Sequence, residues 1–134
     1  MRINKGMKET HCMTVGTADT ARHMKSGSLD VFSTPSMIAL MEEISCGVIS
    51  DALEDGFTSV GTRISVRHLS ATPVGAEVTC ESELTEIDGR RLVFCVKVFD
   101  IGGLIGEGIH ERFIVKSESF MTKTVNKLTE KKDN

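Results

Sequence analysis

Four segments in which apolar and polar side chains alternate make up most of the second half of the sequence. They cover residues 58–69, 77–87, 91–100 and 104–115. Asp88-Gly89 and Gly102-Gly103 separate the last three segments, and such dipeptides are typical of tight hairpins. Alternation over this length predicts strands with one buried face. The chain is therefore expected to form an antiparallel sheet whose apolar face another element has to cover.

One amphipathic helix precedes these strands. Between residues 35 and 54 the apolar side chains recur at helical spacing, at Met37, Leu40, Met41, Ile44, Val48 and Ala52. We expect Thr34 to cap this helix, because Pro35 then occupies the first helical position, where its missing N–H costs nothing. Gly56 follows as a stop signal. Residues 10–15 predict a further strand, and residues 16–30 a long connection with a helical turn near residues 18–24.

These elements predict one α+β domain over residues 1–134, in which one helix lies against a curved antiparallel sheet. Residues 118–134 are expected to form a helical or frayed tail. One helix covers only part of a sheet of this width. A homodimer is therefore expected to bury the apolar residues that the helix leaves uncovered.

Composition excludes several classes of function. With 16 basic and 19 acidic side chains the net charge is −3, so we expect no nucleic-acid partner. No apolar run approaches the ~20 residues that span a bilayer, and the N-terminus lacks a signal-peptide pattern, so we expect no membrane partner and a cytoplasmic location with reduced thiols. The four cysteines show no C-x-x-C spacing, and no metal site is predicted.

A histidine stands at the inward end of one predicted strand. Alternation puts His68 on the same apolar face as Val60, Thr62, Ile64 and Val66, with Gly61 on the other face. A titratable group on such a face needs a partner, because burying it alone is costly. If the helix packs on this strand, the hydroxyl of Thr34 and the carboxylate of Glu42 would meet the imidazole of His68.

Each of these residues also has a purely structural interpretation. Thr34 is fully explained as a helix cap, Glu42 as one of two solvated glutamates, and His68 as a structurally satisfied imidazole. On the last strand His110 lies opposite Ile109 and Phe113, which favours a cross-strand hydrogen bond at a subunit or sheet surface. Arg112 would bind a substrate phosphate or pair with Glu107 or Glu111.

Five segments, in this order, resemble the fluoroacetyl-CoA thioesterase family. They are Val31-Phe32-Ser33-Thr34-Pro35-Ser36-Met37-Ile38-Ala39-Leu40-Met41-Glu42, Ser59-Val60-Gly61-Thr62, His68-Leu69-Ser70-Ala71-Thr72-Pro73, Asp88-Gly89-Arg90-Arg91-Leu92 and Ile105-Gly106-Glu107-Gly108-Ile109-His110-Glu111-Arg112-Phe113. The resemblance implies a hotdog fold, a sheet wrapped around a central helix, and a dimer with active sites at the subunit interface. It places the family's catalytic Thr, Glu and His on Thr34, Glu42 and His68.

The same resemblance implies that the backbone N–H of Gly61 faces the thioester oxygen, and we expect Phe32 and Arg112 to contact the substrate. One departure concerns the lid before the helix. Where the fluoroacetyl-specific enzyme has aromatic residues, this sequence has Lys25 and Ser28. Selectivity for fluoroacetyl groups is therefore not expected, whereas thioester hydrolysis is less affected.

The predicted function is that of an acyl-CoA thioesterase acting on a small or medium acyl group, with coenzyme A as part of the substrate and no further cofactor. His68 would act as general base, Thr34 as attacking or water-orienting hydroxyl, and Glu42 as the partner of the imidazole or as nucleophile. The sequence leaves covalent attack and attack by water open. The alternatives are a non-catalytic acyl-CoA-binding or regulatory hotdog protein, and a hotdog hydratase or dehydratase, whose Asp-x-Asn-x-x-His pattern is missing.

Overall fold

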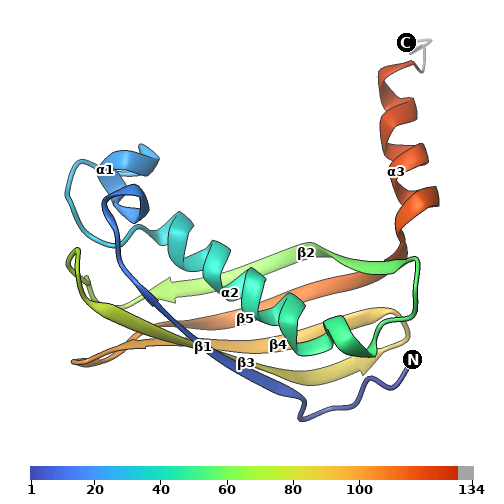
Figure 1. Ribbon diagram of the computed structural model, residues 1–134, viewed down its shortest axis with the longest axis horizontal. Coiled ribbons are helices and arrows are strands. Elements are labelled where there is room, and N and C mark those ends of the chain that lie inside the picture. The colour runs from blue at the N-terminus through green and yellow to red at the C-terminus, as the bar shows by residue number, and fades with distance from the viewer. Residues whose placement is uncertain (130–134) are drawn as a thin grey trace.

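A five-stranded antiparallel sheet curves around one long helix in the computed structural model, which describes residues 1–129 (Figure 1). The strands are β1 (Lys8–Thr14), β2 (Phe57–His68), β3 (Glu77–Asp88), β4 (Arg91–Asp100) and β5 (Gly103–Lys116), in the order β1-β3-β4-β5-β2. The helix α2 (Thr34–Ile49) lies in the concave face. The predicted α+β architecture, with one helix against a curved sheet, is confirmed, and it is the arrangement of the hotdog fold.

The helix begins and ends at other residues than the sequence predicts. Ser33 is the N-cap, and its hydroxyl accepts a hydrogen bond from the N–H of Ser36 at 3.1 Å. Thr34 is consequently the first residue of α2, and its hydroxyl is not engaged in capping. At the other end α2 stops at Ile49, and a 3-10 turn, η2 (Ser50–Ala52), continues the chain to the glycine turn at Gly56.

The core lies between α2 and the middle of the sheet. The fully buried side chains of α2 include Met37, Met41 and Ile49, which pack in one cluster with Leu84 of β3 and Phe94 of β4. Most of the contacts of α2 with the sheet are made to β3, β1 and β4 rather than to β2. The helix is therefore fixed against one half of the sheet, and it approaches β2 only at a few points.

A β-bulge in β2 reverses the alternation that the sequence predicts. Gly61 pairs with Arg112 of β5, and Arg63 pairs with the preceding residue of β5, so Thr62 has no cross-strand partner. An extra residue of this kind turns the following side chains to the other face. Gly61 therefore faces α2 together with His68, and the prediction that Gly61 lies on the other face from His68 is wrong.

A second register shift, between β4 and β5, separates Ile105 from Ile109 and Phe113, which the sequence places on one face of β5. Ile105 lies opposite a register shift between Val98 and Phe99 of β4 and is buried. Ile109 and Phe113 face outward, with 52% and 41% of their surface exposed, whereas His110 is fully buried on the side of α2. The expectation that His110 lies at a sheet or subunit surface is wrong, because the apolar residues of β5 do not mark its buried face.

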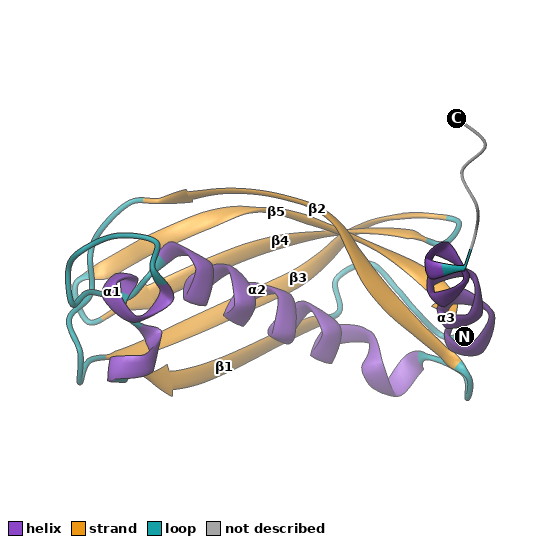
Figure 2. Cartoon of the chain, turned by 90° about the horizontal axis from the view of Figure 1, so that it is seen from above, coloured by secondary structure: helices purple, strands orange, loops and turns teal. Residues whose placement is uncertain are grey.

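The edge of the sheet formed by β2 is long and unpaired in the chain as described. β2 bonds to β5 on one side only, whereas β1 forms the opposite edge (Figure 2). An edge strand of 12 residues leaves a row of backbone donors and acceptors without partners. This edge is available for antiparallel pairing with another strand.

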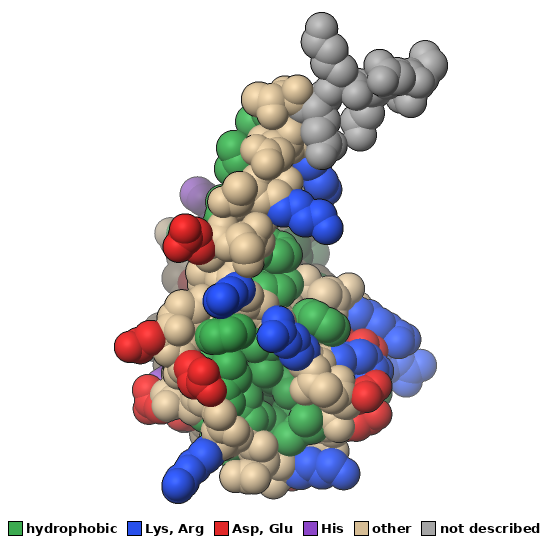
Figure 3. All heavy atoms as spheres, turned by 90° about the vertical axis from the view of Figure 1, so that its right-hand side faces the viewer, with side chains coloured by type: hydrophobic (Ala, Val, Ile, Leu, Met, Phe, Trp, Pro, Cys, Tyr) green, Lys and Arg blue, Asp and Glu red, His purple; other side chains and the backbone are tan. Residues whose placement is uncertain are grey.

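Short helices flank this framework. The connection before α2 contains η1 (Thr17–Asp19) and α1 (Ala21–Met24), in agreement with the predicted helical turn. After β5 the chain forms α3 (Ser117–Val125) and η3 (Asn126–Leu128), and α3 projects away from the sheet (Figures 1 and 3). Residues 130–134 of the predicted tail lie outside the described residues. Among residues 1–129 no helix has the length and apolar character required to cross a membrane.

Candidate active site

The hydroxyl of Thr34 and the imidazole of His68 are hydrogen-bonded at the end of the molecule where α2 begins and β2 ends. The distance from Thr34 Oγ1 to His68 Nδ1 is 2.8 Å. The hydroxyl is available because Ser33 caps the helix in its place. Desolvation by burial lowers the pKa of His68 from its ordinary value, which keeps the ring neutral and able to accept a proton near pH 7.

The second nitrogen of this imidazole is an anomaly. His68 Nε2 is buried and has no hydrogen-bond partner among residues 1–129. Buried polar atoms in folded proteins are almost always hydrogen-bonded, because an unpaired one costs about 1–3 kcal/mol. If the Thr34 hydroxyl donates to Nδ1, the proton of the neutral ring is on Nε2, which then requires an acceptor.

A pocket of about 360 Å³ adjoins this pair. Its lining includes Phe32, whose ring meets that of His68 edge-on, with centroids 6.5 Å apart and planes at 82°. The backbone fixes Phe32, because its N–H donates to the carbonyl of Thr72 at 2.8 Å. Ala21 and Ser26, from the connection before α2, also line the pocket. The structure thus places Phe32 beside the predicted site and leaves its contact with substrate as a prediction.

Glu42 and Gly61 belong to a second cluster. A Cβ atom built on Gly61 would lie 2.9 Å from Glu42 Oε2, 3.3 Å from Arg112 Nη1 and 3.3 Å from His110 Cε1. Three side chains therefore converge on the bare backbone of Gly61. The φ of Gly61 is not positive, so a side chain here would act through space, by displacing the Glu42 carboxylate, and not through the backbone conformation.

The two clusters are separated within one chain. Glu42 follows Thr34 by eight residues of helix, which corresponds to about 12 Å along the axis. Gly61 precedes His68 along β2 by about 20 Å. The structure therefore brings Thr34 and His68 together, and Glu42 and Gly61 together, but it does not join the two pairs within one copy. Within one copy Thr34 and His68 meet without Glu42, and the meeting of all three polar side chains stays a prediction for the assembled protein.

Arg112 has different partners from the two acids that the sequence suggests. Its Nε donates to Ser59 Oγ at 2.8 Å, its Nη2 to the Ser59 carbonyl at 2.9 Å, and its Nη1 lies 3.1 Å from His110 Nε2. Glu111 instead faces outward and accepts from Arg91 Nε at 2.9 Å and Arg63 Nη1 at 3.2 Å. Pairing of Arg112 with Glu107 or Glu111 is thus wrong, and its contact with a substrate phosphate stays a prediction.

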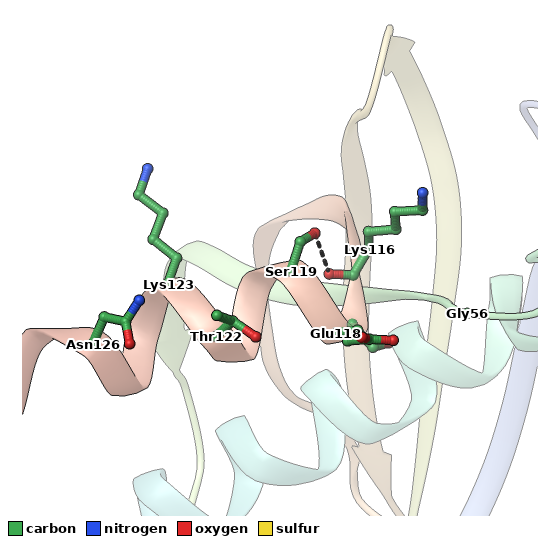
Figure 4. A pocket seen from close by; sticks show the side chains of 8 residues that line it. Gly56, Lys116, Glu118, Ser119, Thr122, Lys123 and Asn126 are labelled. Atoms are coloured by element: carbon green, nitrogen blue, oxygen red, sulfur yellow. Dashed lines mark hydrogen bonds between the residues drawn. The ribbon is translucent and has the colours of Figure 1, made fainter.

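A larger hollow, of about 870 Å³, lies at the base of α3 (Figure 4). Gly56 and polar residues of α3 line it. The side chains of Lys116 and Lys123 point in different directions, so they do not converge on one ligand. Residues 1–129 contain no cluster of three or more potential metal ligands. The candidate catalytic residues therefore lie in the two clusters described above, Thr34 with His68 and Glu42 with Gly61.

Comparison with known proteins finds a matching family, a named relative and several similar solved structures. Residues 15–118 match the model of the family described as fluoroacetyl-CoA-specific thioesterase. The chain is 38% identical over 133 residues to the fluoroacetyl-CoA thioesterase of Streptantibioticus cattleyicolor, covering 95% of this chain and 94% of that protein. A solved structure of a fluoroacetyl-CoA thioesterase superposes with a TM-score of 0.90 at 35% identity, covering 95% of this chain and 98% of the other.

Two further structures extend the comparison. A variant of the fluoroacetyl-CoA-specific thioesterase, in complex with fluoroacetate and CoA, gives a TM-score of 0.82 at 37% identity and covers 88% of this chain and 99% of the other. A thioesterase superfamily member from Thermus thermophilus gives a TM-score of 0.86 at 24% identity and covers 96% of this chain and 97% of the other. At this identity the similarity supports the fold and nothing further.

Fold and comparisons together define the class of the protein as a hotdog-fold thioester hydrolase acting on acyl-CoA. Within that class, the chain belongs to the fluoroacetyl-CoA-specific thioesterase family.

Proposed function

We propose that the protein is a homodimeric acyl-CoA thioesterase whose active sites each combine two subunits. Thr34 and His68 of one subunit would face Glu42 and Gly61 of the other. The observation that carries the proposal is the buried Nε2 atom of His68, which lacks a partner in one chain. Glu42, for its part, makes no hydrogen bond or ion pair within residues 1–129. Each half therefore has an unsatisfied group that the other would satisfy.

The free edge of β2 supplies the geometry. Two β2 strands would pair antiparallel, and we propose the register with a two-fold axis at Ser65 because it brings the two half-sites together. When Gly61 and Thr62 are counted as one step because of the bulge, Gly61 stands opposite the partner's His68, and both face α2. Directly opposed residues have Cβ positions about 5 Å apart. Glu42, which lies against Gly61, would then reach the unpartnered Nε2.

The assembled site would contain the groups that thioester hydrolysis requires. Neutral His68 takes a proton through Nδ1 from Thr34 or from a water molecule that Thr34 orients, and Glu42 stabilises the resulting imidazolium. The N–H of Gly61 and the N-terminus of α2 stabilise the negative charge on the carbonyl oxygen. When the C–S bond breaks, the leaving thiolate takes the proton from the imidazolium. Direct attack by the Glu42 carboxylate is the covalent variant of the same arrangement.

The pocket beside His68 supports a small or medium acyl group, given its volume of about 360 Å³. Lys25 and Ser28 stand at lid positions that are aromatic in the fluoroacetyl-specific enzyme, and they provide no aromatic wall. We therefore propose hydrolysis without preference for the fluoroacetyl group. Coenzyme A is part of the substrate, and no further cofactor is proposed. The free cysteines fit a reducing compartment, and a cytoplasmic location is proposed on that basis.

A panel of acyl-CoA esters, with release of free thiol followed by absorbance, tests the proposal. Hydrolysis of short acyl-CoA esters is expected, with loss of at least about 100-fold in the His68→Ala variant. Binding of an ester without hydrolysis of any member would instead identify a regulatory acyl-CoA-binding protein. Addition of water to an unsaturated acyl-CoA without thiol release would identify a hydratase.

A further inference from the structure

A buried histidine that the reaction does not use, His110, lies against Gly61 on the side that faces α2. We propose that His110 is a positioning residue that, together with Arg112, holds the bulge of β2 in the shape that thioester hydrolysis requires. The proposal rests on the proposed function for its kinetic consequences, but its structural basis is independent of the substrate. It is built from the hydrogen bonds on either side of the bulge.

His110 and Arg112 hold β2 at two points that flank Gly61. On one side Arg112 makes two hydrogen bonds to Ser59, at 2.8 Å to Oγ and 2.9 Å to the carbonyl oxygen. On the other side His110 Nδ1 lies 2.8 Å from the carbonyl oxygen of Arg63. The contact of 3.1 Å between Arg112 Nη1 and His110 Nε2 joins the two. We call this set of four residues, Ser59, Arg63, His110 and Arg112, the bulge clamp.

The partners of His110 determine its protonation state and its tautomer. A carbonyl oxygen only accepts, so Nδ1 carries the proton, and a guanidinium only donates, so Nε2 is the acceptor. The ring is therefore neutral. Burial lowers its pKa, and the charge of Arg112 lowers it further, against the opposing effects of the Arg63 carbonyl, Glu42 and Glu111. A protonated ring would lose the hydrogen bond from Arg112 and place two cations in contact.

The bulge clamp acts on the reacting groups in two ways. First, bulges disrupt the local ladder, and bonds on both sides of Gly61 limit the motion of its backbone N–H. Second, Arg112 is only 7% exposed and has no carboxylate within 4.0 Å among residues 1–129, so its charge is directed toward Gly61 and Glu42. A fixed cation in a site with little water stabilises a developing oxyanion more than a mobile one would.

The test compares two substitutions of His110. Leucine keeps an apolar side chain against Phe94 and removes both hydrogen bonds, whereas glutamine keeps a donor and an acceptor. We expect His110→Leu to lower kcat by about 10–100-fold with KM within about threefold of wild type, and His110→Gln to recover most of the loss. The matched controls His11→Leu and His11→Gln, on the exposed surface of β1, are expected to leave both constants unchanged.

Nuclear magnetic resonance of the imidazole gives a readout that does not depend on substrate. In the wild-type protein we expect a slowly exchanging proton on Nδ1 of His110 and an unprotonated Nε2 from pH 6 to 8. The opposite tautomer, or wild-type kcat in a folded His110→Leu variant, would overturn the proposal. If the protein hydrolyses no acyl-CoA, the proposed function fails while the tautomer still tests the bulge clamp.

Should His110→Leu not fold, Ser59→Ala replaces it in the test. This change removes the hydrogen bond from Arg112 Nε to Ser59 Oγ and leaves the one from Arg112 Nη2 to the Ser59 carbonyl in place. A drop of about 3–10-fold in kcat with unchanged KM is expected. Unchanged kcat in Ser59→Ala would contradict the positioning role.

Discussion

Thr34 Oγ1 and His68 Nδ1 are 2.8 Å apart, although Thr34 is the first residue of α2 and His68 is the last residue of β2. The contact exists because Ser33 takes the capping role that Thr34 would otherwise have. A hydroxyl released from capping and bonded to an imidazole with a lowered pKa is suited to proton transfer.

Adjacent substitutions at the start of α2 separate stability from catalysis. Thr34→Val should lower kcat by about 100-fold and leave the free energy of unfolding within about 0.5 kcal/mol, since Thr34 is not the cap. Ser33→Ala should destabilise by about 1 kcal/mol and keep most of the activity. Urea unfolding and thiol-release kinetics measure both quantities. Equal loss of stability in the two variants would contradict this division of roles.

Activity and stability should both fall on the acid side. Burial and the charge of Arg112 lower the pKa of His110, so near pH 6.5 the unfolded chain binds a proton that the folded chain does not. The free energy of unfolding is therefore expected to decrease as the pH falls below about 6.5, and the acid limb of kcat/KM should lie below that value. Urea titrations from pH 5 to 8 would reveal this slope, and a stability that increases toward pH 5 would contradict it.

Replacing Gly61 by alanine should act on Glu42. The new Cβ would stand 2.9 Å from Glu42 Oε2, so the carboxylate has to move. Because the φ of Gly61 is not positive, the backbone itself tolerates alanine. We expect a loss of at least about 10-fold in kcat with a folded protein. Circular dichroism checks the fold. A wild-type kcat in the folded variant would show that the position of the carboxylate is not critical.

The sequence predicts the framework well because hairpin signals and alternation are local. The helix at residues 35–54, the hairpins at Asp88-Gly89 and Gly102-Gly103, and the strands between them agree with the structure within a few residues. The face of β2 on which Gly61 lies was predicted wrongly. A single extra residue at Thr62 reverses the alternation, and the signal for it, a glycine inside the strand at Gly61, also fits a close backbone approach without a bulge.

The candidate site was predictable only in part for a different reason. Parity correctly points His68 toward the start of α2, and the resemblance to a known family selects Glu42 and Gly61. Their separation from His68 follows from three-dimensional lengths along α2 and β2. His110 was missed because its neighbours Ile109 and Phe113 suggested the wrong buried face, although a histidine between glycines and an arginine was a visible signal.

The most direct test of the shared active site mixes two inactive variants, Glu42→Gln and His68→Ala. In a heterodimer one site would contain His68 from the first variant and Glu42 from the second, and would be intact, while the other site would lack both. Random exchange of subunits in an equal mixture should therefore restore about a quarter of the wild-type activity. Recovery no greater than the sum of the two separate variants would show that Glu42 and His68 do not act across the subunit interface.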